Sequence, residues 1–100
     1  MALKVIWSPQ AIETFSEIVD YLHKYWTEKE VTNFVRQSNK IIEHICYNPG
    51  MYRESEKKKH QHRAFIFKPV SLVYRYKPRK KEIELITFWN NRRNPKKLKH

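Results

Sequence analysis

Side chains able to act on a phosphate group gather in the second half of the chain, where residues 51–100 hold 16 Lys and Arg against four Asp and Glu. Cleavage of RNA through its ribose 2′-hydroxyl needs a base, an acid for the leaving oxygen, and cations that stabilise the crowded phosphate. Arginine suits only the last task, because it stays protonated near neutral pH and binds phosphate through two parallel hydrogen bonds. The arginines that could do so are Arg63, Arg75, Arg92 and Arg93.

Proton transfer would fall to lysine or histidine. Lysine acts as a base where neighbouring cations depress its pKa, and histidine titrates near the required pH. His60 and His62 stand beside Arg63, and Lys57 opens a run of three lysines just before them. If the protein is a nuclease, its catalytic candidates are Lys57, His60, His62, Arg63, Lys68, Arg75 and Arg92.

Each candidate also has a plainer interpretation. The lysine run fits a solvated loop, the two histidines fit loop residues, and Arg75 fits a position on a sheet face. Trp89 could stack on a base or anchor the core. An Arg92–Arg93 pair at the end of a strand is hard to explain by packing, which makes it the leading candidate for binding. The candidates for binding nucleic acid or another target are Lys57, Lys58, Lys59, Arg63, Arg75, Trp89, Arg92, Arg93, Lys96 and Lys97.

The charge is segregated along the chain. Residues 1–50 hold five Lys and Arg against six Asp and Glu, so the formal net charge of +11 arises in the second half. One-sided positive charge is typical of proteins whose partner is a polyanion, such as nucleic acid, an acidic protein or an anionic membrane. No apolar run approaches the roughly 20 residues that a membrane span needs, and no signal-peptide pattern opens the sequence. We therefore expect a cytoplasmic protein that does not enter a membrane.

The sequence carries no pattern for a cofactor or a metal. Cys46 is the only cysteine, which excludes a disulfide within the chain and fits a reducing compartment. Neither Cys-x-x-Cys nor His-Glu-x-x-His spacing occurs, and His23 and His44 fall on different predicted helices, so we expect no metal site. A single glycine excludes a glycine-rich phosphate loop, and no cofactor is expected.

The first half of the sequence predicts a strand followed by two helices. Residues 3–7 are apolar, and Ser8 then caps a helix of about 17 residues with Pro9 at its first position. The box Thr27-Glu28-Lys29-Glu30 starts a second helix at once, with the Thr27 hydroxyl accepting the Glu30 amide, and 48–50 end it. So short a link predicts an antiparallel hairpin. The predicted core stripes are Ile12, Phe15, Val19, Leu22 and Trp26 on the first helix, and Val31, Phe34, Val35, Ser38, Ile41, Ile42 and Ile45 on the second.

The second half predicts strands, because its apolar residues alternate. Residues 51–54 fit a short edge strand, 56–62 a loop, and 63–68, 71–77 and 82–89 three further strands. The predicted face-sharing groups are Phe65 with Phe67; Leu72, Tyr74 and Tyr76, with Val73 and Arg75 on the other face; and Ile83, Leu85 and Thr87 opposite Glu84, Ile86 and Phe88. Residues 1–100 thus form one α+β domain: an N-terminal strand, an antiparallel helical hairpin, and a mostly antiparallel sheet of three or four strands, with the first strand pairing at its edge.

The order and spacing of several short motifs resemble the RelE/ParE superfamily, the bacterial toxins of type II toxin–antitoxin modules. The resemblance covers nearly the whole chain. It rests on the helix entry Trp7-Ser8-Pro9-Gln10-Ala11, the helical hairpin, the exit Asn48-Pro49, Arg63 opening a strand, the strand Leu72-Val73-Tyr74-Arg75-Tyr76, and the ending Asn91-Arg92-Arg93-Asn94-Pro95.

The resemblance implies one of two activities. RelE-like members enter the ribosome and cut mRNA, whereas ParE-like members inhibit DNA gyrase and need no nuclease site. The ending Arg92-Arg93-Asn94-Pro95 is similar to the ParE side, while the loop lysines and histidines keep the nuclease open. Either activity implies a cognate antitoxin, for which the basic half favours an acidic segment, and a target that is the ribosome with its mRNA or DNA gyrase. A non-toxic nucleic-acid-binding module is a further alternative.

Overall fold

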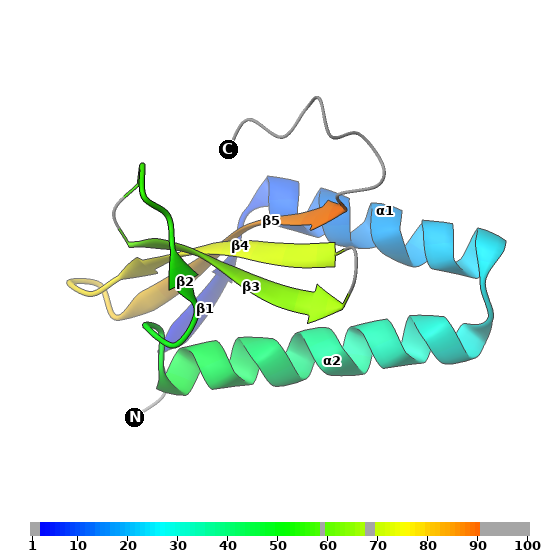
Figure 1. Ribbon diagram of the computed structural model, residues 1–100, viewed down its shortest axis with the longest axis horizontal. Coiled ribbons are helices and arrows are strands. Elements are labelled where there is room, and N and C mark those ends of the chain that lie inside the picture. The colour runs from blue at the N-terminus through cyan, green and yellow to red at the C-terminus, as the bar shows by residue number, and fades with distance from the viewer. Residues whose placement is uncertain (1–2, 59, 68–69, 91–100) are drawn as a thin grey trace.

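Along the chain, two helices separate the first strand from the other four. The computed structural model describes residues 3–58, 60–67 and 70–90. The elements are β1 (Lys4–Trp7), α1 (Pro9–Tyr25), α2 (Glu28–Tyr47), β2 (Arg53–Glu54), β3 (Gln61–Phe67), β4 (Val70–Lys77) and β5 (Glu82–Asn90). The five strands form one sheet in the order β1-β5-β4-β3-β2, with β1 parallel to β5 and the other pairs antiparallel (Figure 1). The predicted α+β class, helical hairpin and edge position of the first strand are confirmed.

The two helices begin where the sequence predicts, although only one start uses the predicted hydrogen bond. The amide of Ala11 donates to Ser8 Oγ over 3.0 Å, and that hydroxyl donates in turn to the carbonyl of Ile86 at 2.9 Å. Ser8 therefore caps α1 and ties it to β5. Thr27 occupies the cap position of α2, but its hydroxyl lies 3.3 Å from the Glu30 carboxylate instead of accepting an amide. The predicted capping box is wrong in this respect.

The inner face of α1 is rotated from the predicted stripe. Ile12 and Trp26 are 55% and 57% exposed, so their predicted place in the core is wrong. Trp26 follows the last helical turn in extended conformation, where the helical period no longer applies. The side chains of α1 that are buried are those of Ala11, Ile18 and Leu22, and Phe15 and Val19 pack against them. The stripe of α2 is confirmed, with Phe34, Ser38, Ile41 and Ile45 buried.

Two irregularities in strand pairing decide which side chains reach the core. In β5 the register passes from Leu85 opposite Tyr74 to Thr87 opposite Val73, which leaves Ile86 as the extra residue of a bulge. A bulge reverses the alternation beyond it. Phe88 therefore joins the core, and its predicted place opposite Ile83 and Leu85 is wrong.

A second shift separates the two phenylalanines of β3. The register is irregular between Phe65 and Phe67. Phe67 packs against the core beside Phe34, whereas Phe65 is 58% exposed on the other face. The prediction that they share a face is wrong for the same physical reason: an extra residue in one strand reverses the alternation of its side chains between the two faces of the sheet.

A threonine of α1 holds the bulge of β5. The amide of Phe88 donates to Thr14 Oγ1 over 2.9 Å, and that hydroxyl donates to the carbonyl of Gln10 at 2.8 Å. We expect Thr14→Val, which has the same shape without the hydroxyl, to lower the free energy of unfolding by about 1–2 kcal/mol, because the Phe88 amide loses its partner. Urea titration of Thr14→Val and Thr14→Ser measures this. Equal losses in both variants would contradict the assigned role of the hydroxyl.

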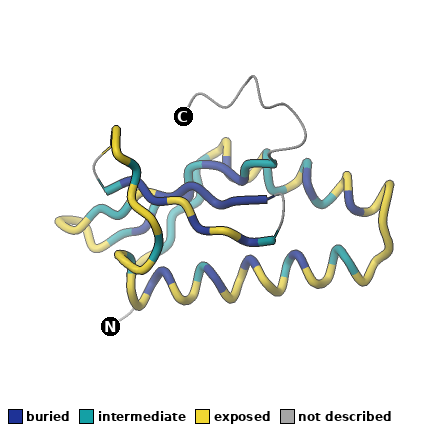
Figure 2. The backbone as a smooth tube through the Cα atoms, viewed as in Figure 1, coloured by how far each residue is buried: buried dark blue, intermediate teal, exposed yellow. Residues whose placement is uncertain are grey.

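One face of the sheet carries both helices, and the opposite face has no helix over it among the residues described. Helix α1 packs mainly on β5 and α2 on β3 (Figure 1). Figure 2 shows β4 buried along most of its length, while β3 alternates between buried and exposed positions. Ala64 and Ile66 of β3 lie in the core, so the intervening odd-numbered positions face away from the helices. We call this surface the open face.

Candidate anion-binding site on the open face of the sheet

Three neighbouring strands each place one arginine on the open face. Arg53 of β2 lies directly opposite Arg63 of β3 in the register. Arg63 is paired with Val73 of β4, and Arg75 follows two positions later on the same face. Side chains directly opposite have Cβ atoms about 5 Å apart, and diagonal neighbours about 7–8 Å. These three residues, which we call the arginine row, therefore cross the sheet as a diagonal line of positive charge.

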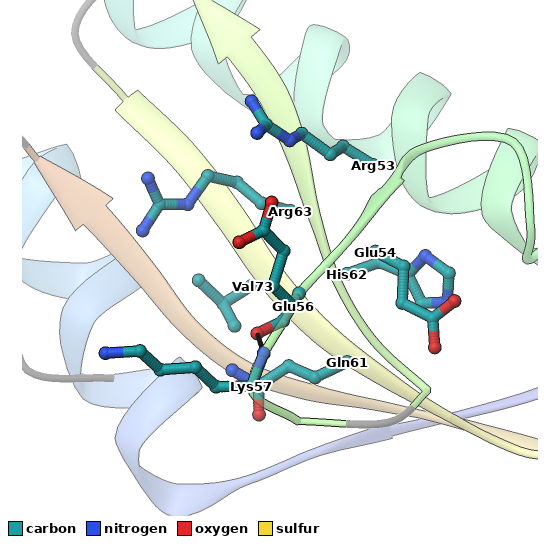
Figure 3. Close-up of a pocket in the computed structure, with 9 residues that line it drawn as sticks. Arg53, Glu54, Glu56, Lys57, Gln61, His62, Arg63 and Val73 are labelled. Atoms are coloured by element: carbon teal, nitrogen blue, oxygen red, sulfur yellow. Dashed lines mark hydrogen bonds between the residues drawn. The ribbon is translucent and has the colours of Figure 1, made fainter.

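A pocket of about 320 Å³ lies beside the arginine row. Figure 3 shows Arg53, Arg63 and Lys57 directed to one side of β3, with Glu54 and His62 on its other side. The residues that line the pocket come from β2, the loop after β2, β3 and β4: Arg53, Glu54, Ser55, Glu56, Lys57, Gln61, His62, Arg63 and Val73.

The loop that carries Lys57 is held in place by short-range hydrogen bonds. Ser55 Oγ accepts the amides of Lys57 and Lys58, each over 3.2 Å. The amide of His60 donates to Glu54 Oε2 at 2.8 Å. Such side chain–backbone bonds fix the path of a turn. Lys57 and Lys58 therefore lie in a defined turn that begins at the edge of the arginine row.

A second hollow, of about 430 Å³, adjoins the far end of the row. His60 has a left-handed backbone with φ of 65°, and its ring meets that of Tyr76 edge-on, with centroids 6.3 Å apart. The lining carries further cations from the turn between β4 and β5, and consists of His60, Arg75, Tyr76, Lys77, Pro78, Arg79 and Lys80. Arg75 lines this hollow and Arg63 lines the first pocket, so the arginine row connects the two.

No ion pair offsets the charge of the arginine row among the described residues. Glu84 stands opposite Arg75 in the register, but it forms its ion pair with Lys77 at 3.4 Å. Within the described ranges 3–58, 60–67 and 70–90, no ion pair reaches any of the three guanidinium groups. Three arginines without an ion pair among the described residues, on one exposed surface, are an arrangement that attracts anions.

One predicted catalytic residue lies away from this surface. His62 was expected in a loop, but it belongs to β3 and is buried on the helix side of the sheet. Its Nδ1 lies 3.0 Å from the carbonyl of Tyr52, and its ring stacks on Tyr74 with centroids 5.1 Å apart. The contacts of the imidazole are therefore with the protein interior, and the ring lies on the opposite side of the sheet from Arg53 and Arg63.

The structure brings together part of the candidate set. Lys57 and Arg63 share the first pocket, and His60 and Arg75 share the second hollow. Lys58 is exposed in the loop beside them, and Trp89 is half-buried opposite Ser71. The remaining candidates lie outside the described residues: Lys59, Lys68, Arg92, Arg93, Lys96 and Lys97.

Sequence reasoning missed Arg53. A two-residue strand has no periodicity from which its outward face could be inferred, and only the register places Arg53 opposite Arg63. Arg79 and Lys80 were not among the candidates from the sequence either, and they line the second hollow. The signal that the sequence offered for Arg53 was the presence of one arginine in each of three successive predicted strands, 51–54, 63–68 and 71–77.

Two other kinds of chemistry were searched for in the described part of the chain. No group of three or more His, Cys, Asp and Glu there could hold a metal ion, and no described helix is long and apolar enough to cross a membrane. Cys46 is buried, and burial together with the charge of Glu43 raises the pKa of its thiol. A thiol in that state is a weak nucleophile.

Comparison with known proteins agrees with the fold. The fold is that of the RelE/ParE superfamily of toxins. The model of the ParE toxin of type II toxin–antitoxin systems (parDE) matches residues 5–95, and the chain belongs to this family. A solved structure described as the chromosomal ParDE TA system from P. aeruginosa superimposes with a TM-score of 0.71 at 18% identity, covering 89% of this chain and 96% of that one. A comparison with curated proteins gave no match.

Proposed function

We propose that this toxin arrests growth by inhibiting DNA gyrase and that it acts by binding, without chemistry of its own. The observation that carries the proposal is the match of the ParE model to residues 5–95. The geometry supports it, because the arginine row supplies charge for binding but no group that exchanges protons near neutral pH. His62, which could have exchanged protons, is buried on the opposite side of the sheet.

A ribosome-dependent nuclease is the second candidate, and one observation favours it. Lys57 and Arg63 line the same pocket, and His60 and Arg75 line the adjoining one. A candidate for proton transfer and a phosphate-binding arginine would therefore be present in each of the two pockets. A plain nucleic-acid-binding module without toxicity is the third reading, and it would use the same surface.

We further propose that an acidic antitoxin neutralises the toxin. The similar solved structure is described as a ParDE toxin–antitoxin system, and the formal net charge of +11 favours a partner of opposite sign. A flexible acidic segment that folds as it binds could cover a large part of the basic surface.

Two assays on one preparation of the purified full chain separate the candidates. We expect the protein to inhibit supercoiling by gyrase and to leave mRNA on translating ribosomes intact. The toxin mixed beforehand with its antitoxin is the control, and it should inhibit neither reaction. Cut mRNA with unaffected supercoiling would replace the gyrase proposal with the nuclease, and inactivity in both assays together with harmless expression in cells would leave the binding module.

A further inference from the structure

We propose that the arginine row binds the sugar–phosphate backbone of DNA, so that the toxin contacts the DNA held by gyrase as well as the enzyme. The role in a gyrase complex rests on the proposed function, whereas the binding site itself is argued from the open face alone. The partner is defined by its chemistry, a line of closely spaced phosphates. The residues concerned are Arg53, Arg63 and Arg75, with Lys57 beside them.

The first argument is energetic. Arg53 and Arg63 stand directly opposite each other on adjacent antiparallel strands. Like charges in that relation destabilise a sheet. Neither guanidinium has an ion pair within the described residues to offset the repulsion. Glu56 lines the same pocket without forming an ion pair to either arginine. An anion that binds between the two arginines would offset their repulsion.

The second argument is the shape and chemistry of the pocket. Guanidinium groups bind phosphate oxygens through two parallel hydrogen bonds, and they do so most strongly at the edge of a water-poor surface. Val73 is buried, lies opposite Arg63 on the adjacent strand and gives the pocket its apolar lining, while Lys57 lines the pocket from the loop. The pocket of about 320 Å³ has room for a phosphate with its adjoining sugar.

The third argument concerns length. Adjacent strands lie about 4.8 Å apart, so the arginine row on three strands spans roughly 10 Å before side chains are added. One DNA strand carries a phosphate for about every 3.4 Å of helix axis. The row is therefore longer than the axial spacing of successive phosphates, and it matches the backbone of a DNA strand better than a single small anion. Arg75 extends it toward Arg79 and Lys80 in the second hollow.

An acidic peptide is the other anion that this surface could bind, because arginine clusters recognise acidic motifs as well as phosphate groups. The lining of the first pocket is polar apart from Val73. Glu56 also lines it, and its carboxylate repels any anion equally, so it does not favour one partner over the other. The regular spacing of phosphates along a DNA strand suits a row of arginines on successive strands, and on this ground we commit to a phosphodiester partner.

The test is the salt dependence of binding to a fluorescent duplex of about 25 base pairs, measured by anisotropy with the full chain and no gyrase. Each phosphate contact contributes about −0.9 to the slope of log K against log salt. We expect Arg63→Ala to flatten the slope by about one such step and to weaken binding about tenfold. Arg53→Ala should do the same, and Glu56→Gln should tighten binding. Cations elsewhere in the chain act in every variant and cancel in the difference.

The matched control is Arg36→Ala on the exposed side of α2, which removes the same charge far from the open face. It should leave the slope unchanged. Equal slopes for Arg63→Ala, Arg36→Ala and the unmodified protein would overturn the proposal, as would the absence of DNA binding. A loss of affinity for an acidic antitoxin peptide in Arg63→Ala, with DNA binding intact, would assign the row to the peptide instead.

The outcome is separable from that of the gyrase assay. If Arg63→Ala loses DNA affinity while the unmodified protein fails to inhibit supercoiling, the DNA site stands and the gyrase proposal falls. If supercoiling is inhibited equally by Arg63→Ala and by the unmodified chain, with unchanged slopes, gyrase is the target and the arginine row is not its DNA contact. Thermal unfolding of each variant confirms that only folded proteins are compared.

Discussion

Phe34→Ala is expected to lower the free energy of unfolding by about 3–5 kcal/mol, the largest loss among the substitutions considered. Phe34 is 1% exposed and sits where both helices meet the sheet. Its ring centroid lies 5.1 Å from that of Phe15, 5.6 Å from Phe67 and 6.2 Å from Phe88. Truncation therefore removes aromatic contacts to three elements at once and leaves a cavity that rigid strands cannot close.

A loss of that size is a large share of the roughly 5–15 kcal/mol that holds such a domain together. Urea titration followed by near-ultraviolet circular dichroism measures it. Phe65→Ala is the matched control, because it makes the same chemical change at a side chain that is 58% exposed on the open face. It should change stability by no more than about 0.5 kcal/mol. Similar losses at both positions would contradict the assignment of the core to the helix side.

The helices could be predicted from sequence because their signals are local. Ser8 and Pro9 mark the start of α1, and the stripe from Phe34 to Ile45 follows one period throughout α2. Trp26 was misassigned because the helix ends one residue earlier, and a period carries no information beyond its last turn. Local rules therefore predict the existence of an element better than the exact face that it buries.

The faces of the sheet were less predictable from the sequence, because the face that a side chain occupies depends on how its strand pairs with the next. The extra residue at Ile86 is a property of β5 and β4 together, and it moves Phe88 into the core against the simple alternation. The site shares this dependence. Arg63 and Arg75 could be named from the sequence, but Arg53 joins them only through its register with β3.

The two faces of the sheet carry different kinds of side chain, so we expect that stability and binding can be altered separately. The helix side gathers the aromatic rings, whereas the arginine row adds repulsion and no packing. Arg53 can be truncated without opening a cavity, because its side chain is exposed. We therefore expect substitutions on the open face to change the affinity for an anion while the fold remains, so that the binding experiments can be interpreted.

Tyr74 should make the protein unstable in alkali. Its side chain is 0% exposed, and its hydroxyl donates to the carbonyl of Pro49 over 2.8 Å. Burial, and secondly the nearby Tyr52, raise the pKa of Tyr74 well above the ordinary 10.0. The folded state therefore keeps a proton that the unfolded chain releases. The stabilisation is fully present below pH 10 and is lost as the pH rises toward the folded value, by about 1.4 kcal/mol per pH unit.

Tyr74→Phe isolates this effect, because phenylalanine does not titrate. At pH 8 the variant should be about 1 kcal/mol less stable than the unmodified protein, since the Pro49 carbonyl loses its donor. Above pH 10 the unmodified protein loses stability faster, so the two curves of unfolding free energy against pH should cross near pH 11. Tyr21→Phe, at a side chain that is 46% exposed, is the control and should follow the unmodified protein throughout. Parallel curves for Tyr74→Phe and the unmodified protein up to pH 11.5 would show that the phenol ionises as readily in the folded state as in the unfolded chain.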